Sequence, residues 1–322
     1  MLAIDIIKRR KIWFFLSGTM MTAAIFALTF WGINFGIDFK GGSLLEVEYQ
    51  DVRPDINVVK NALSPLALGS PSVQPVGEKG LIIRFRETSE EVHQSVLSKL
   101  RESVQTEAVE NQSAGNGEGE ENSQPAESVI ENRFDSVGPS IGEELKSRSL
   151  SAIILVLAAM ILYIAWSFRK VSKPIASWKY GLVAIIALFH DVLITVAVFS
   201  VMGKFWQIEI NTPFVAAILT VIGYSVNDTI IVFDRLRENL PKSDLDFAAT
   251  INKSVLQTLS RSINTSFTTI LVLTAIIIFG GDSIREFVLA LAVGILTGTY
   301  SSIFFASPLL AVWEKWQRRM HA

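Results

Sequence analysis

Cysteine is absent from this chain of 322 residues, and only three histidines occur. Without cysteine the protein can form neither disulfide bonds nor thiolate metal sites, and we expect no metal centre and no cofactor. The phosphate-binding pattern Gly-x-x-x-x-Gly-Lys-Ser/Thr is also missing, so nucleotide hydrolysis would have to belong to a partner. The formal net charge is only −2, which gives no support to nucleic-acid binding.

Long apolar runs are what the chain has in excess. Half of the residues are hydrophobic, and the mean hydropathy is +0.39. Six runs are long enough to cross a bilayer, namely residues 12–33, 150–168, 180–202, 213–233, 263–280 and 284–312. The first run exceeds the core of a secretory signal and ends without a cleavage pattern, so it is expected to be a retained anchor. The sequence therefore predicts an α-helical polytopic membrane protein with six transmembrane helices.

Basic residues next to the span ends predict the topology. Lys and Arg gather before the first span, between spans two and three, between spans four and five, and after the last span. Because such residues resist crossing to the outside, both termini are expected to be cytoplasmic. The predicted domains are residues 1–33 with the first span, an outer domain at 34–149, and the remaining spans with a tail at 150–322.

The outer domain is acidic, with 20 acidic and 11 basic residues between 34 and 148, against 11 and 18 elsewhere. Its apolar periodicity predicts a β-α-β-β-α-β order. The expected elements are strand 43–49, helix 55–63, strands 73–76 and 81–86, helix 88–109 and strand 128–137. This order is typical of a ferredoxin-like α+β domain. Thr88, or alternatively Ser89, is the expected N-cap of the second helix.

One stretch of the outer domain has the composition of a disordered segment. Residues 110–127 are rich in Asn, Gln, Ser, Gly and Glu and contain no large apolar side chain. Such a stretch buries too little apolar surface to order itself. We predict an inserted surface loop, with a docking tail as the alternative.

Asp228 is the single charged residue between positions 213 and 233. An ionisable group at that depth is costly, which indicates a function. A low dielectric favours the protonated form of a carboxyl group, and an approaching cation favours the ionised form, as a proton relay requires. Asn227 beside it and Arg261 before the fifth span are candidate partners. A purely structural bond from Asp228 to a neighbouring helix stays open.

The third span contains a second polar pair, His190 and Asp191. Adjacent side chains on a helix point about 100° apart, so they cannot both face one partner. We count Asp191 among the candidate relay residues, although a structural hydrogen bond to the next helix fits either residue equally well.

Two further patterns concern packing of the helices. Small residues recur every four positions in the last span and predict close helix contact; they are Ala290, Gly294, Gly298 and Ser302. Residues 234–262 place apolar side chains at helical spacing, which predicts an amphipathic cytoplasmic hairpin along the inner membrane interface.

Three motifs resemble those of SecF subunits of the bacterial Sec protein translocase, in the SecD/SecF family of the resistance-nodulation-division superfamily. They are Gly36-Ile37-Asp38-Phe39-Lys40-Gly41-Gly42-Ser43, His190-Asp191, and Gly223-Tyr224-Ser225-Val226-Asn227-Asp228-Thr229-Ile230 followed by Asp234-Arg235-Leu236-Arg237-Glu238-Asn239. Six spans and one outer domain also match that family, whereas the stretch 110–127 departs from it.

The resemblance implies a half-transporter that acts with SecD at the bacterial inner membrane and uses the proton-motive force to complete preprotein export. The implied partners are SecD, the SecYEG channel with SecA, YajC, YidC, the preprotein and membrane lipid. The resemblance also implies that Asp228 carries the proton and that Arg261 governs its protonation. The implied link from the first span to the periplasmic domain contains Gly36, Asp38, Gly41 and Gly42. The coupling ion, H⁺ or Na⁺, is left open.

Three other classes of protein compete with this interpretation. A stand-alone small-molecule exporter of the same superfamily typically has twelve spans, twice the number here. An intramembrane aspartyl protease needs two carboxylates at one water, but Asp228 follows Asn rather than Tyr, and Phe279-Gly280-Gly281-Asp282 has Phe where that pattern needs Gly. A passive scaffold would tolerate loss of Asp228. The protease is the one enzyme among these classes, and its motifs do not fit, so we predict no enzymatic activity.

Overall fold

The computed structural model describes residues 5–51, 53–66, 68–69, 71–86, 89–113, 129–167 and 176–321. The chain divides into two compact units. We call residues 1–34 with 149–322 the helical unit, and residues 35–148 the sheet unit.

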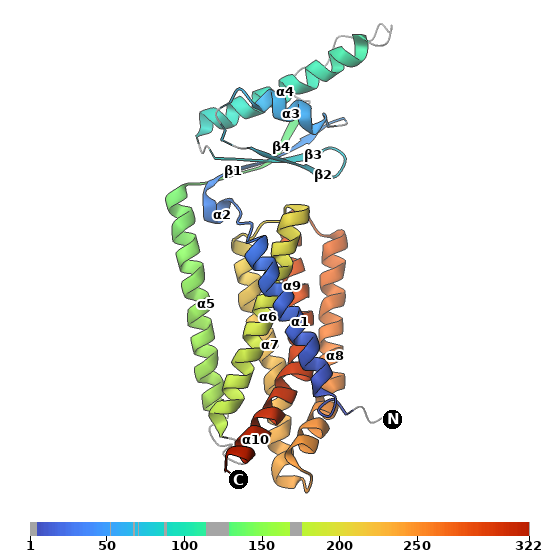
Figure 1. Ribbon diagram of the computed structural model, residues 1–322. Coiled ribbons are helices and arrows are strands. Elements are labelled where there is room, and N and C mark those ends of the chain that lie inside the picture. The colour runs from blue at the N-terminus through green and yellow to red at the C-terminus, as the bar shows by residue number, and fades with distance from the viewer. Residues whose placement is uncertain are drawn as a thin grey trace. The chain divides into compact units, whose positions relative to one another are not determined.

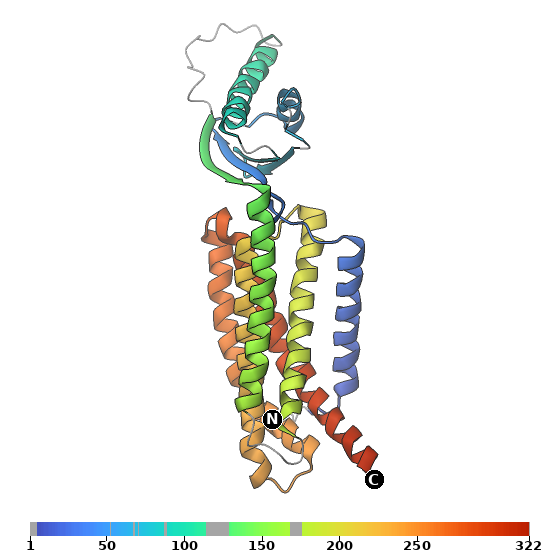
Figure 2. The same ribbon diagram turned by 90° about the vertical axis from the view of Figure 1, so that its left-hand side faces the viewer.

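Six helices among the described residues are long and apolar enough to cross a membrane, which confirms the predicted number of spans (Figures 1 and 2). They are α1 (Arg10–Phe30), α5 (Pro139–Ser167), α6 (Ser177–Trp206), α7 (Thr212–Asn239), α8 (Phe247–Phe279) and α9 (Asp282–Ser301). The sixth span continues from α9 through the π-helical turn η2 (Ser302–Ala306) into α10 (Ser307–His321). A π-helical turn inside a helix is rare and often lies at a functional site.

Helices α7 and α9 pack together through the predicted stripe of small residues. A Cβ atom on Gly294 would lie 2.3 Å from Val221 Cγ2, and one on Gly298 would lie 2.9 Å from Ser225 Cβ. Any larger side chain would therefore push the helices apart. The stripe has the packing role that the sequence predicts.

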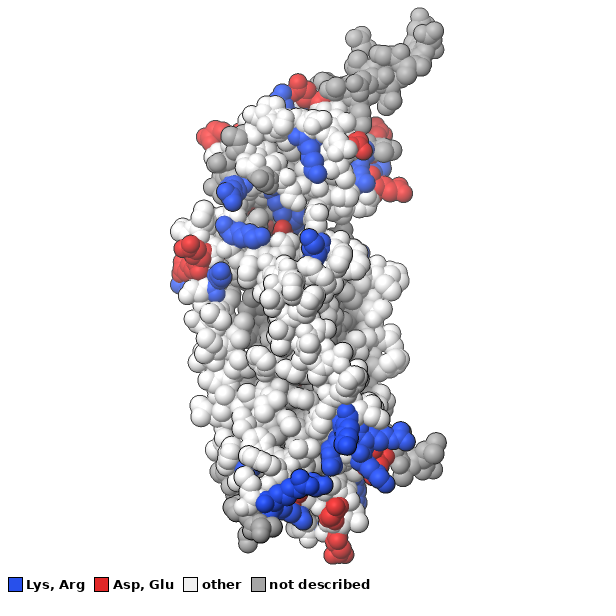
Figure 3. Space-filling view, viewed as in Figure 1, with Lys and Arg blue, Asp and Glu red and all other residues white. Residues whose placement is uncertain are grey.

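The outer surface of the helical unit is apolar. Figure 3 shows a middle zone of these helices without charged side chains, and Lys and Arg gathered at the end where α1 begins and α10 ends. Large apolar side chains such as Phe15, Leu155 and Trp206 are exposed. This distribution suits helices surrounded by lipid.

The segment between the fourth and fifth spans is a hairpin, as the sequence predicts. Helix α7 continues to Asn239, a 3₁₀ turn follows (η1, Leu240–Lys242), and α8 begins at Phe247 and runs unbroken to Phe279. Residues 234–262 therefore form a helical hairpin whose arms are extensions of α7 and α8. Their apolar side chains, including Ile251 and Val255, are buried because the two arms pack on each other.

The sheet unit contains four antiparallel strands in the order β2-β3-β1-β4. The strands are β1 (Gly42–Tyr49), β2 (Ser72–Val76), β3 (Gly80–Phe85) and β4 (Val129–Val137). Helix α3 (Ile56–Leu63) lies between β1 and β2 in the chain, and α4 (Glu90–Ser113) lies between β3 and β4. Both helices cover one face of the sheet (Figure 1). Alternate β1 residues, Leu45, Val47 and Tyr49, point into the core beneath them. The sequence of elements is the predicted β-α-β-β-α-β.

Helix α4 differs from its prediction at both ends. It runs to Ser113, so the first residues of the predicted insertion are helical, and residues 114–127 lie outside the described residues. The Val92 N–H donates to Ser89 Oγ at 3.4 Å, which makes Ser89 the N-terminal cap. Thr88 lies outside the described residues.

Candidate functional site

Asp191 lies completely buried on α6 and is well supplied with hydrogen-bond donors. Ser225 Oγ of α7 and Ser301 Oγ of α9 donate to its Oδ2 at 2.6 and 2.7 Å. His190 Nδ1 lies 3.0 Å from its Oδ1. Both hydroxyl distances are those of well-formed O–H···O hydrogen bonds. Asp191 therefore links α6 to the α7–α9 contact, as in the structural alternative that the sequence leaves open.

His190 is also completely buried but faces different neighbours. Its ring stacks on Phe305 of η2, with the centroids 4.9 Å apart. Its Nε2 has no hydrogen-bond partner within the described residues. A neutral ring protonated on Nδ1 fits this arrangement, because Nδ1–H then donates to Asp191 and Nε2 keeps only a lone pair. Asp191 thus bonds to α7 and α9, whereas His190 stacks on η2 and bonds only to Asp191 among the described residues.

Asp228 follows Ser225 by almost one turn on α7 and is only 2% exposed. Its Oδ1 accepts one long hydrogen bond, 3.4 Å, from Ser262 Oγ of α8, and its Oδ2 has no hydrogen-bond partner in the described part of the chain. Buried carboxylates are normally saturated with donors. Asp191 is therefore a closed site, and Asp228 is an open one.

Three hydroxyl groups meet beside Asp228, one from each of three helices. Ser266 Oγ of α8 lies 2.5 Å from Thr299 Oγ1 of α9 and 3.4 Å from the hydroxyl of Tyr224 on α7. The Thr299 hydroxyl also interacts with the Asp228 carboxyl. Asp228 thus has an uncharged polar neighbourhood, to which α8 and α9 contribute as much as its own helix.

The remaining predicted partners of Asp228 face outward. Asn227 and Arg261 are both exposed in this chain, on α7 and α8. The charge of Arg261 still attracts the Asp228 carboxylate. Since adjacent residues on a helix point about 100° apart, Asn227 cannot share the buried face of Asp228.

Sequence reasoning did not identify Ser225, Ser262, Thr299 and Ser301 as members of these two sites. Serine and threonine are common in helical spans, and no local pattern marks the ones that meet a carboxylate on another helix. The one available signal was the position of Ser225 inside the motif that contains Asp228.

The glycine motif of the sheet unit surrounds α2 (Ile37–Lys40), which Gly36 precedes and whose first turn contains Asp38. Gly41 and Gly42 have φ values of 74° and 125°, a backbone region that favours glycine. A Cβ on Gly41 would lie 2.8 Å from Pro139 Cα, and one on Gly42 would lie 2.6 Å from the Phe85 carbonyl oxygen. The start of β1 therefore requires two glycines.

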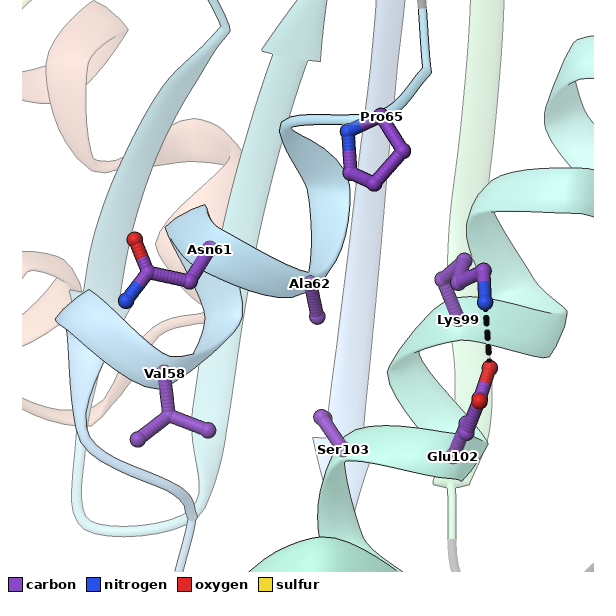
Figure 4. Close-up of a pocket in the computed structure, with 7 residues that line it drawn as sticks. All are labelled: Val58, Asn61, Ala62, Pro65, Lys99, Glu102 and Ser103. Carbon is purple, nitrogen blue, oxygen red and sulfur yellow. Dashed lines mark hydrogen bonds and ion pairs between the residues drawn. The ribbon is translucent and has the colours of Figure 1, made fainter.

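A groove of about 340 Å³ separates α3 from α4 in the sheet unit (Figure 4). Its lining consists of Val58, Asn61, Ala62, Pro65, Lys99, Glu102 and Ser103. The two charged residues pair with each other at 2.6 Å. No cluster of His, Asp or Glu suited to a metal ion occurs among the described residues. The two buried carboxylates of the helical unit are therefore the stronger candidate site.

Comparison with known proteins relates this arrangement to a family. The family described as "Protein export membrane protein SecD/SecF, C-terminal" matches residues 119–316, and the SecD/SecF GG motif matches residues 26–51. The chain belongs to the SecD/SecF family. The first match contains Asp191 and Asp228, and the second contains Gly41 and Gly42.

Individual relatives support the SecF branch of the SecD/SecF family. The protein translocase subunit SecF of Thermobaculum terrenum is 41% identical over 97% of this chain and 94% of its own length. That of Anaerolinea thermophila is 37% identical over 98% of this chain and 96% of its own length. These near-complete matches support an accessory role in Sec translocation, which is not an enzymatic activity, so they argue against the protease alternative.

Solved structures of SecDF share the fold. The crystal structure of SecDF, a translocon-associated membrane protein from Thermus thermophilus, matches 98% of this chain with a TM-score of 0.75 and 28% identity. A SecDF structure in a super-membrane-facing form matches 99% of this chain with a TM-score of 0.64 and 28% identity. This chain spans only 40% of either SecDF chain. Together with the six apolar helices, SecD/SecF membership makes the chain a multi-pass membrane protein.

Proposed function

We propose that this chain uses the proton-motive force, together with SecD, to drive late-stage preprotein export, and that Asp228 carries the coupling ion. The observation that supports the proposal is the open state of Asp228. The carboxyl group is enclosed by helices, yet Oδ2 accepts no hydrogen bond within the described residues. A carboxylate in such surroundings is stabilised by taking up a proton or a cation and is free to release it again.

Asp191 suits a different role in the same mechanism. Its three donors already compensate its charge, so an additional proton would have to displace one of them. We assign to Asp191 the positioning of α7, since its bond to Ser225 lies almost one turn from Asp228 on that helix.

SecD is the partner that this arrangement calls for. The relatives are SecF subunits and the matching structures are of SecDF, so we expect SecD to pack a second helical unit against this one. Polar side chains lie exposed on the faces of α7 and α8 beside Asp228, namely Thr220, Asn227, Arg261 and Asn264. Polar groups facing hydrocarbon are unfavourable. Cover by SecD would place Asn227 and Arg261 at the subunit boundary, where the charge of Arg261 acts on Asp228.

We place both termini on the cytoplasmic side of the bacterial inner membrane and residues 34–149 in the periplasm, because Lys and Arg gather at the span ends on one side. SecYEG with SecA, YajC, YidC and the translocating preprotein are the further partners of the proposed complex. Gly36, Asp38 and Gly41 lie between α1 and β1 in the chain, and Gly42 is the first residue of β1. A movement of α1 would therefore reach the sheet unit through them.

The available energy suits such a movement. One elementary charge that crosses 100 mV yields about 2.3 kcal/mol. A few protons per cycle would supply enough free energy to shift a two-state arrangement of helices almost completely, since about 5.5 kcal/mol moves a population from 1:99 to 99:1.

The test replaces Asp228 with Asn in the complex with its SecD partner. The matched control is Asp244→Asn, an exposed carboxylate in the loop before α8. Late-stage export is measured in proteoliposomes with ATP-driven transport completed and a proton-motive force imposed. We expect Asp228→Asn to abolish the response while SecD still co-purifies, and Asp244→Asn to behave as the parent. Normal export by Asp228→Asn would instead favour a passive scaffold.

A further inference from the structure

The hydroxyl groups of Tyr224, Ser266 and Thr299 form a continuous line that ends at Asp228. Tyr224 lies four residues before Asp228 on α7, and Ser266 lies four residues after Ser262 on the antiparallel helix α8. Both residues are therefore one helical turn nearer to the membrane side on which α7 begins. Tyr224 is partly exposed, and Ser266 is buried. The line thus leads from the partly exposed Tyr224 to the buried Asp228.

The direction of this line follows from the bonds at its inner end. Thr299 Oγ1 donates to the carbonyl oxygen of Ile295 at 2.9 Å. Because a hydroxyl group has one proton, Thr299 accepts from Ser266 when its own proton lies on the Ile295 carbonyl. Ser266 in turn has no second proton for Tyr224, so Tyr224 donates to Ser266. In this arrangement the Tyr224 and Ser266 donors both point toward Thr299.

One rotation would complete the connection. If Thr299 turns its proton from the Ile295 carbonyl to the Asp228 carboxyl beside it, an acceptor is available, because Oδ2 has no hydrogen bond in the described residues. A simple tie between α8 and α9 would explain the 2.5 Å contact of Ser266 with Thr299. It would explain neither the aligned donor from Tyr224 nor the unused acceptor of Asp228.

We propose that Tyr224, Ser266 and Thr299 form a hydroxyl relay that delivers protons to Asp228 from the membrane side on which α7 begins. The inference rests on the proposed function, because a relay has a role only if Asp228 exchanges protons. In one passage Thr299 gives its proton to Asp228 Oδ2, Ser266 reprotonates Thr299, and Tyr224 reprotonates Ser266. Tyr224 takes its replacement from a hydronium ion at its exposed side, which leaves water. Asp228 becomes neutral, and each hydroxyl group regains its proton.

The experiment measures proton uptake by the complex with SecD, reconstituted in vesicles that enclose a pH-sensitive dye, under an imposed potassium diffusion potential. Ser266→Ala and Thr299→Val remove the inner hydroxyl groups, and Ser266→Thr and Thr299→Ser retain them. Thr274→Ala is the matched control, because Thr274 lies two turns further along α8 and donates only to the carbonyl oxygen of Ile270. We expect Ser266→Ala and Thr299→Val to slow uptake about tenfold, the effect of one lost hydrogen bond on a transfer rate.

The variants separate the relay from the proposed function. We expect Ser266→Thr, Thr299→Ser and Thr274→Ala to keep the parental rate, and all variants to keep the parental unfolding temperature. Parental uptake by Ser266→Ala, together with none by Asp228→Asn, overturns the relay but leaves Asp228 as the ion carrier. Parental uptake by Asp228→Asn overturns the proposed function itself. Uptake of sodium instead of protons, measured with a sodium-sensitive dye at equal pH, also overturns the relay.

Discussion

Replacing a buried carboxylate with its amide is expected to destabilise the protein strongly at Asp191 and very little at Asp228. Asp191 accepts two hydroxyl bonds of 2.6 and 2.7 Å and a third bond from His190. Asparagine has only one acceptor oxygen. Placed at the Oδ2 position, that oxygen keeps both serine donors but turns the NH2 group toward Nδ1–H of His190, and in the other orientation the NH2 group faces both serines. A bond to a charged acceptor contributes about 1.5–3 kcal/mol, and loss of one or two of them should lower the free energy of unfolding of Asp191→Asn by about 2–5 kcal/mol.

The same change at Asp228 removes little hydrogen bonding. Its carboxyl accepts one 3.4 Å bond, and Oδ2 accepts none in the described part of the chain. The neutral amide also avoids burial of a charge. We expect Asp228→Asn to remain within about 1 kcal/mol of the parent, as most substitutions without a lost contact do.

The assay is reversible unfolding in mixed micelles with increasing denaturing detergent, followed by circular dichroism. Interhelical side-chain hydrogen bonds in membranes average about 0.6 kcal/mol. A loss of unfolding free energy near about 0.6 kcal/mol for Asp191→Asn would show that its hydroxyl bonds are no stronger than this average. A double-mutant cycle with Ser301→Ala checks the cause. Because both changes remove the same bond, their combined effect must be smaller than the sum. Equal losses for Asp191→Asn and Asp228→Asn would refute the distinction between a closed and an open carboxylate.

Two further predictions concern packing and pH. Gly294→Ala should destabilise the helical unit by about 1–3 kcal/mol, because its Cβ would lie 2.3 Å from Val221 Cγ2; Gly18→Ala, with no atom within 4 Å, should be neutral or stabilising in the same unfolding assay. In the sheet unit, hydrogen bonds led by that from Gln94 hold the pKa of Glu90 below its ordinary value of 4.5. Folding therefore favours the ionised form of Glu90. Its contribution to the free energy of unfolding is fully present above pH 4.5 and is lost as the pH falls through the lowered pKa. Hydrogen exchange of α4, corrected for intrinsic rates, should show this loss of protection, and Gln94→Ala should reduce its pH dependence; an unchanged profile in that variant would contradict the assignment.

Much of the fold was accessible from sequence because its signals are local. The six spans follow from hydropathy over about 20 residues each, and the order of strands and helices in the sheet unit follows from apolar periods of 2 and 3.6. The ends of the apolar runs are not the ends of the helices. Helix α7 continues past residue 233, and α8 begins at Phe247, ahead of the apolar run that starts at residue 263, because helical backbone hydrogen bonds continue where hydropathy falls.

By itself the sequence determined that Asp228 and Asp191 lie within membrane-spanning helices and that small residues bring two of those helices together. Each conclusion depends on residues a few positions apart, whose relation is set by the geometry of one helix. Only the tertiary structure decided which carboxylate is saturated and which is open. Ser225 and Ser301, which close Asp191, lie 34 and 110 residues from it in the chain, and Ser262, the one serine bonded to Asp228, lies 34 residues away. Hydrogen bonds act between atoms about 3 Å apart whatever their separation in sequence, so the character of each carboxylate was set when α6, α7, α8 and α9 packed.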